Sequence, residues 1–217
     1  MSKRGPEREA TLKAAKGFLI GLVTCGLIGG AIALFSMKGL YLLPDKVCDG
    51  AVQRDIAIQS LPRARAAEEH SNQGGTGDKF DFYCNVSTSG DSILSGMVDL
   101  RDTPRSAWEE HYGSLAGNHV IRVTRGGIEA LTQTDDDSAI SSVYVSCQPR
   151  NMKEDAGKQE YALIAEVNVT GKSRATGGEL RQALTDFAYQ LTRHAYKLAE
   201  CKEPRSFPEA LPRYEED

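Results

Sequence analysis

The strongest hydrophobic pattern in the chain is an uncharged run at residues 17–37, which reads GFLIGLVTCGLIGGAIALFSM and lies between two lysines. The run lacks the polar stripe that a helix on the surface of a soluble domain carries. At about 1.5 Å of rise per residue, a helix of this length reaches roughly 30 Å, the thickness of the hydrocarbon core of a bilayer. The pattern therefore predicts a transmembrane helix.

A cleaved secretion signal is the alternative interpretation of the same run. Ala31-Ile32-Ala33 has the small-residue pattern that a signal peptidase recognises. However, the apolar residues continue to Met37, beyond the usual length of the hydrophobic region of a signal, and residues 1–16 include two glutamates. An uncleaved anchor is therefore the favoured interpretation.

Basic residues are distributed unequally around this run. Residues 1–16 contain five lysines and arginines, whereas residues 38–53 contain two. Because positively charged flanks stay in the cytoplasm, we expect the N-terminus inside and the larger C-terminal part outside. Two Gly-x-x-x-Gly spacings, which begin at Gly17 and Gly26, would also allow two such helices to approach closely, so self-association in the membrane stays open.

The first elements beyond the run are expected to be helical or irregular. Cys48, Val52 and Ile56 recur every four residues and predict a short helix over 48–60. Residues 64–70 could add a further helical turn. The Gly-rich composition of residues 72–78 indicates a loop.

Strands are predicted wherever apolar and polar residues alternate. Alternation over 79–100, interrupted by turn-forming residues at 89–91, predicts a β-hairpin. Apolar residues on either side of Arg125-Gly126-Gly127 predict a second hairpin. A fifth strand is expected to end at Cys147, and unbroken alternation over 161–169 predicts a sixth.

Two later segments have helical periodicity. Trp108 and Tyr112 share one face of a predicted helix over 104–115. Apolar residues over 180–198 recur at helical spacing for about five turns, which predicts the longest amphipathic helix of the outer part. This helix ends close to Cys201, so a disulfide at that cysteine would hold it in place.

These elements together predict an α+β fold. Most connections are short, so the expected sheet is mostly antiparallel and six-stranded, with the helices packed on one face. The outer part is long enough for one core, which makes a single domain the default. The expected organisation is listed here by residue: a cytoplasmic basic leader at 1–16, a transmembrane helix at 17–37, an extracytoplasmic disulfide-stabilised domain at 38–201, and a disordered acidic tail at 202–217.

The charge balance excludes one class of partner. The whole chain has a formal charge of −4, and the leader carries five basic and two acidic residues, so residues 38–217 carry −7. Nucleic-acid binding requires a basic face. We therefore expect no nucleic acid as a partner.

Four cysteines lie beyond the apolar run, at Cys48, Cys84, Cys147 and Cys201. Four cysteines outside a membrane predict two disulfides. Metal binding is the weaker alternative, because the chain has no C-x-x-C motif and no histidine at ligand spacing. Of the three pairings, Cys48–Cys84 with Cys147–Cys201 is favoured, since each would join a helix end to a strand end within one half of the domain.

Few residues indicate chemistry. The segment Gly90-Asp91-Ser92-Ile93 resembles the nucleophile block of GDSL/SGNH hydrolases, but both flanks alternate like strands and the Asp-x-x-His motif of that family is absent, which indicates a hairpin turn. The pattern assigns no catalytic, cofactor-binding or metal-binding residue. If a ligand groove exists, Trp108, Tyr112 and Tyr83 are the first aromatic contacts to test, although a core role is favoured for the lone tryptophan.

The outer part carries motifs of a structural kind: LPDKVCDG at 43–50, FYCNV at 82–86, YVSC at 144–147 and AEC at 199–201. With the basic leader and the single apolar run, they resemble single-pass membrane-anchored envelope proteins of actinobacteria. The resemblance implies an envelope location and disulfides. It implies no activity and assigns no functional residue.

We therefore expect a binding or interaction module of the cell envelope, anchored in the cytoplasmic membrane and displayed outside it. The bilayer would be contacted through residues 17–37, and a further partner would be an envelope protein or a wall component. No cofactor is expected. The alternative is an envelope hydrolase or transferase whose active site the sequence does not reveal.

Overall fold

The computed structural model describes residues 39–113, 119–134, 139–150 and 159–214, together with Val23 and Gly26. The expected leader and transmembrane helix lie outside this range, apart from those two residues. Within the described residues, no helix is long and apolar enough to cross a membrane.

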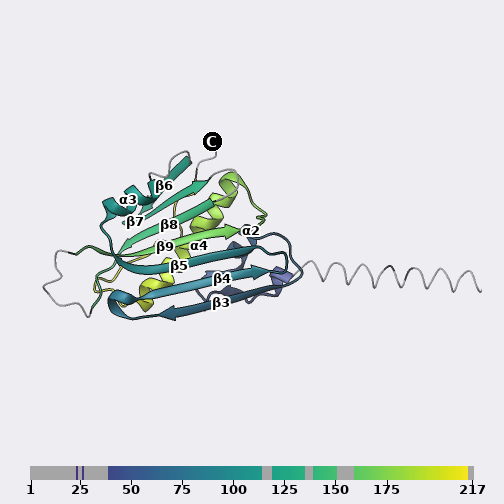
Figure 1. Cartoon of the computed structure of the whole chain (residues 1–217), viewed down its shortest axis with the longest axis horizontal. Helices are drawn as coiled ribbons and strands as arrows, with labels where there is room; N and C mark the ends of the chain where they lie inside the picture. The colour runs from purple at the N-terminus through teal and green to yellow at the C-terminus, as the bar shows by residue number, and fades with distance from the viewer. Residues whose placement is uncertain are drawn as a thin grey trace, which may run out of the picture.

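A seven-stranded antiparallel sheet forms the centre of the domain (Figure 1). Its order is β3-β4-β5-β9-β8-β7-β6, so the late strand β9 lies between β5 and β8. The two predicted hairpins are confirmed as β4–β5 and β6–β7. The bounds are β3 Ala67–Gly74, β4 Asp81–Thr88, β5 Ile93–Asp102, β6 His119–Arg125, β7 Ile128–Thr134, β8 Ala139–Ser146 and β9 Tyr161–Thr170.

The expectation of six strands was wrong, because β3 occupies the segment assigned to a helical turn and a loop. This strand pairs with β4 along its whole length, from Ala67 opposite Thr88 to Gly74 opposite Asp81. Its sequence AEEHSNQG is almost entirely polar. An edge strand is held by backbone hydrogen bonds to one neighbour and buries little side-chain surface, so it does not need the apolar alternation that reveals an inner strand.

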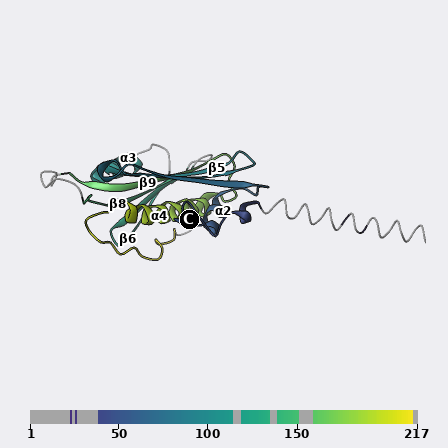
Figure 2. The same ribbon diagram turned by 90° about the horizontal axis from the view of Figure 1, so that it is seen from below.

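Helices cover both sides of the sheet, which corrects the expected one-sided arrangement (Figure 2). The helices are α2 Arg54–Ser60, α3 Arg105–Gly113 and α4 Gly177–Leu198, with short 3-10 turns η1 Gly39–Leu42 and η2 Gly77–Lys79. Helices α2 and α4 lie on one side, here called the inner side, and α3 lies on the other, the outer side. Trp108 and Tyr112 of α3 pack on Tyr144 and Ile164, which form a core cluster separate from the one beneath α4.

The long amphipathic helix is confirmed as α4, which packs across β5, β9, β8 and β7. Phe187 and Leu191 lie directly over Gly96 in β5. A Cβ atom added at Gly96 would lie 2.8 Å from the Leu191 side chain and 3.0 Å from that of Phe187. Glycine within this strand therefore permits close approach of the helix to the sheet.

The expected helix over 48–60 is only partly present. Residues 46–53 form a two-stranded ribbon of β1 Lys46–Val47 and β2 Val52–Gln53, and α2 begins after it. The ribbon turns through three successive left-handed residues, Cys48, Asp49 and Gly50, with φ values of 62°, 55° and 78°. Cys48, Val52 and Ile56 recur every four residues because the ribbon and α2 both face the same core, not because they belong to one helix.

The two favoured disulfides are confirmed as Cys48–Cys84 and Cys147–Cys201. The first joins the turn of the ribbon to the middle of β4, rather than a helix end to a strand end. The second joins the residue after β8 to the residues that follow α4. Both bonds therefore attach inner-side elements to the sheet.

The tail, expected to be disordered, packs against the domain over residues 202–214. Arg205 donates hydrogen bonds to the carbonyl oxygens of Gly126 and Gly127, and Leu211 is buried. The Tyr214 hydroxyl joins a buried cluster of hydroxyl groups that connects the tail to β7, β8 and α4: Thr132, Ser141, Thr185 and Tyr214. The remaining residues, 215–217, lie outside the described range.

Close packing of α4 on β5 predicts that Gly96→Val destabilises the protein by about 1–3 kcal/mol, because the added side chain displaces Phe187 and Leu191. Ser95→Val is the matched control, since Ser95 faces the outer side on the same strand, and we expect a change within about 0.5 kcal/mol. Urea unfolding of both variants measures the difference. Equal losses of stability would contradict the packing described here.

Loss of either disulfide should weaken the fold strongly. The bonds close loops with sequence separations of 36 and 54 residues. On the chain-entropy model each stabilises the protein by about 4 kcal/mol, so C147A/C201A should lower the free energy of unfolding by about that amount. The variant Cys25→Ala, which removes the cysteine outside both pairs, should unfold like the unmodified protein in the same urea titration.

Candidate functional site

The outer side of the sheet is only partly covered by α3, which packs on β7, β8 and part of β9. The uncovered part is called the open face and includes these outward side chains from β3, β4, β5 and β9: His70, Asn72, Tyr83, Asn85, Ile93, Ser95, Met97, Glu166 and Asn168. None of these side chains is fully buried. The open face combines amide, hydroxyl, aromatic and apolar groups on four adjacent strands.

One row of paired residues crosses the open face and reaches α3. Tyr83 pairs with Met97, Met97 with Glu166, and Glu166 with Ser142. Neighbouring strands lie about 4.8 Å apart, so Tyr83 and Glu166 are separated by about 10 Å across the sheet. The side chains of α3 bond to the last two members of this row, which places the edge of the helix beside the open face.

The structure places Trp108 in the core rather than on a surface. Its side chain is 0% exposed, and its indole N–H donates a hydrogen bond of 2.8 Å to the Ser142 hydroxyl. The ring centroid lies 5.3 Å from that of Tyr144. Trp108 anchors α3 to β8 and offers no surface to a ligand.

Tyr112 lies at the boundary between α3 and the open face. Its hydroxyl donates a hydrogen bond of 2.7 Å to Glu166, and the Gln133 side-chain amide donates to its backbone carbonyl. Burial raises the pKa of Tyr112 well above its usual value, and the hydrogen bond to Glu166 raises it further. The phenol therefore stays protonated and holds the Glu166 carboxylate in place.

A cluster of four charged side chains fixes α3 to β6 and β7. Arg105 lies 2.5 Å from the buried carboxylate of Glu129 and 2.9 Å from Glu109. Arg122 lies 3.3 Å from Glu109. These ion pairs join Arg105 and Glu109 of α3 to the strands beneath the helix. They explain how a short helix of low hydrophobicity keeps its position on the outer side.

A small hollow of about 180 Å³ lies between α3 and the end of β5. Arg101, His111 and Tyr112 contribute its polar groups. Burial alone would lower the pKa of Arg101, but its 2.5 Å ion pair with Asp99 outweighs that effect, so the pKa is raised. Because the guanidinium is already paired, the hollow offers little free charge to a ligand.

Tyr83 belongs to the open face itself. The Asn85 side-chain amide donates a hydrogen bond of 2.6 Å to its hydroxyl, and the His70 ring lies edge-on at 6.0 Å. Next to it on β5, Met97 is 42% exposed and Ile93 is 36% exposed. A mixed aromatic and aliphatic surface therefore follows β4 and β5.

Sequence reasoning found Tyr83 and Tyr112 but missed Ile93 and Met97. A signal for them was present, because the inward residues of β5 are Leu94, Val98 and other even positions, and the two missed residues are apolar at odd positions. Their phase in the strand places them on the outer side of the sheet rather than in the core. The place of His70 on this face was not predicted, because β3 was not expected.

The three histidines whose side chains are described lie on separate elements. His70 is on the open face, His111 lies 4.7 Å from the Tyr112 ring on α3, and His194 packs at 5.2 Å against Phe82 on the inner side. Burial lowers the pKa of His194. No hydrogen bond joins any of these three rings to a nucleophile or carboxylate within the described residues, so they form no catalytic relay there.

The hairpin-turn interpretation of residues 90–93 is confirmed. Ser92 connects β4 to β5, is fully buried, and accepts a hydrogen bond of 3.0 Å from the Lys172 backbone N–H. A serine in this position holds two loops together and is not presented to a substrate.

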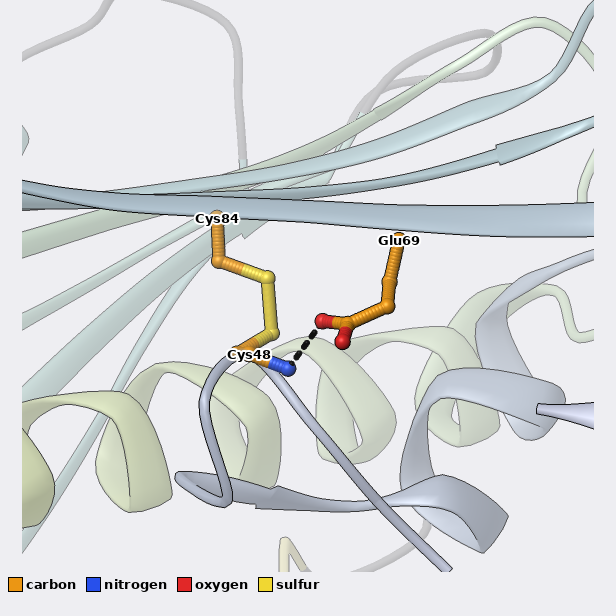
Figure 3. A group of neighbouring side chains, drawn as sticks. All are labelled: Cys48, Glu69 and Cys84. Atoms are coloured by element: carbon orange, nitrogen blue, oxygen red, sulfur yellow. Dashed lines mark hydrogen bonds between the residues drawn. A yellow bond between two sulfur atoms is a disulfide. The ribbon is translucent and has the colours of Figure 1, made fainter. Parts of the chain in front are cut away.

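Cys48, Glu69 and Cys84 are the described residues whose donor atoms lie close enough together to hold a metal ion (Figure 3). The two sulfur atoms are bonded to each other, so neither is the thiolate that a metal requires. The Glu69 carboxylate accepts a hydrogen bond of 2.5 Å from the Cys48 backbone N–H. The arrangement stabilises the left-handed turn of the ribbon on the inner side.

No protein-family model, curated protein or solved structure matches this chain. The function must therefore be inferred from the surfaces themselves. The open face brings together partly or fully exposed side chains of mixed chemistry from four adjacent strands.

Loss of the Tyr112 hydroxyl should destabilise the domain, because the half-buried Glu166 carboxylate would lose its donor. We expect Tyr112→Phe to cost about 2 kcal/mol at neutral pH. Tyr161→Phe is the matched control, since its hydroxyl bonds an exposed side chain, that of Gln159. The control should change the free energy of unfolding by less than about 0.5 kcal/mol.

The same variant has a defined pH dependence. Since the folded-state pKa of Tyr112 is raised above the unfolded value, its contribution to stability is full below about pH 10 and is lost as the pH rises further. The stability gap between the unmodified protein and Tyr112→Phe should therefore shrink above about pH 10. A gap that stays constant through the alkaline range in urea titrations would contradict this assignment.

Proposed function

We propose that this protein is a binding module of the cell envelope, anchored by a single helix in the cytoplasmic membrane, whose open face binds a partner protein outside that membrane. The observation that carries the binding role is the exposure of two apolar residues of β5, Ile93 and Met97, which lie on the outer side of the strand and not on its buried side. They lie on a sheet surface that α3 leaves uncovered in the described part of the chain.

Two features support the location. Disulfides persist in oxidising compartments outside the cytoplasm, and both bonds hold the domain that follows the apolar run 17–37. The excess of basic residues before that run favours a cytoplasmic N-terminus. The domain would then stand on the outer surface of the membrane.

A protein partner fits the open face better than a wall glycan does. Methionine and aromatic side chains are enriched in protein interfaces, and Met97 and Tyr83 occupy adjacent strands here. A platform for stacking a sugar ring needs an exposed aromatic face, whereas Trp108 is buried and Tyr83 is half-buried. The surrounding amide and hydroxyl groups would form the polar rim of an interface.

A hydrolase or transferase is the less favoured alternative. Catalysis of acyl or glycosyl transfer needs a nucleophile or acid beside a base. Among the described residues, Ser92 is buried in a turn, and the histidines with described side chains lie apart from it and from one another. These residues therefore do not place a nucleophile or an acid beside a base.

A photo-crosslinking amino acid at Met97 tests the proposal with the full chain in its native membrane. We expect one adduct of reproducible mass, because the partner lies against β5. The matched control carries the same group at Glu209, which is exposed on the tail at the inner side, and should give no such adduct. Met97→Glu should prevent capture by a probe at Ile93.

Outcomes against the proposal are also defined. Adducts that are absent at Met97, or identical at Met97 and Glu209, would remove the open face as the binding surface. Turnover of a wall or lipid substrate by the purified protein would favour the enzyme. Free thiols at all four outer cysteines in intact cells would contradict the location.

A further inference from the structure

Four exposed basic side chains lie in loops at one end of the sheet, where the continuous described segment begins at Gly39: Arg63, Arg65, Lys172 and Arg174. They are called the basic rim. Figure 1 shows this end at the right of the sheet, where β4 and β9 end and the purple N-terminal segment lies. Its loops come from three separate parts of the chain, at residues 61–66, 88–92 and 171–175.

The start of the described chain is held directly against the rim. The Gly39 backbone N–H donates a hydrogen bond of 3.1 Å to the Ala64 carbonyl. A Cβ atom at Gly39 would lie only 2.3 Å from the Arg65 backbone, so glycine is required for this close approach. The chain therefore enters the domain at the rim.

Backbone contacts also join the three loops to one another. The Arg65 N–H donates to the Ser89 hydroxyl at 3.2 Å, which links the first loop to the second. The Lys172 N–H donates to Ser92 at 3.0 Å, which links the second to the third. These bonds fix the positions from which the basic side chains extend.

The rim differs in charge from the rest of the outer part. Its three loops contain four basic residues and one acidic residue, Asp91, which gives +3 within a region that carries −7. Within the described residues, no rim side chain forms an ion pair. Two acidic groups, Asp55 and Glu179, line a groove of about 500 Å³ together with Arg174.

Aromatic and aliphatic side chains accompany the charge. In η1, Tyr41 is 52% exposed and Leu42 is 65% exposed. Gly39 follows the end of the expected membrane helix, Met37, by two residues, which span at most about 7 Å. Tyrosine is enriched at the boundary between lipid and water, so this composition suits the headgroup layer.

We propose that the basic rim binds the anionic phospholipid headgroups of the bilayer that holds residues 17–37. This inference rests on the proposed function, since it requires the membrane anchor. Each lysine or arginine near an anionic surface favours the bound state by about five-fold. Because β4 and β9 end at the rim, the strands would point toward the membrane and the open face would be presented sideways to a partner.

Hydrogen exchange of the full chain in lipid nanodiscs tests the inference. Discs of phosphatidylcholine alone are compared with discs that also contain phosphatidylglycerol. Amides of the three rim loops should exchange about ten-fold more slowly in the anionic discs, and high salt should remove this protection. Amides at the opposite end of the sheet should exchange equally in both discs.

Two quadruple variants with the same net charge distinguish lipid binding at the rim from general attraction between a basic protein surface and an anionic membrane. R63A/R65A/K172A/R174A should lose the lipid-dependent protection. K79A/R150A/K197A/K202A removes four exposed basic residues from the opposite end and should retain it. Equal loss in both variants would overturn the inference, because protection would then follow net charge alone.

The remaining outcomes are equally distinct. If the unmodified chain inserts and its rim amides exchange equally fast in both discs, the rim is not a lipid-binding site. The proposal of a membrane anchor would not be affected by that result. Failure to insert into either disc overturns the anchor and the inference together. Protection in neutral discs by added glycerol phosphate would identify a soluble phosphate ligand and would overturn the assignment to lipid.

Discussion

Packing of α4 against the inner side of the sheet is the constraint on which the rest of the structure depends. Its apolar stripe covers four strands and closes over the glycine of β5, so the main core lies between these two layers. Both disulfides, the ribbon at the start of the domain and the tail at its end attach to this same side. The inner side therefore carries most of the contacts that stabilise the fold.

The outer side is covered less completely than the inner side. An antiparallel sheet can expose one of its sides, and α3 covers only the portion formed by β7, β8 and part of β9. That helix is fixed by buried groups, the indole of Trp108 and the carboxylate of Glu129, rather than by a wide apolar stripe. Its edge forms a border of the open face, where Tyr112 bonds to Glu166.

The two ends of the sheet differ because of chain connectivity. Gly39, at the start of the domain, lies at the same end at which β4 turns into β5 and β9 leaves the sheet, so three loops meet there with this segment. Basic side chains from distant parts of the sequence become neighbours for this reason. A surface of opposite charge to the domain as a whole can arise in this way without a basic run in the sequence.

The amino-acid sequence by itself determined the inner strands β4, β5, β8 and β9 and the helix α4, because burial imposes a regular period on apolar residues. It favoured the disulfide pairing that the structure has, but it left all three pairings open. It also identified Tyr83 and Tyr112 as residues of interest. Only the tertiary structure decided the polar edge strand β3, the side on which α3 packs, the position of the tail and the row that links Tyr83 to Glu166. These features depend on backbone pairing and on contacts between distant segments, and neither leaves a periodic signal in the local sequence.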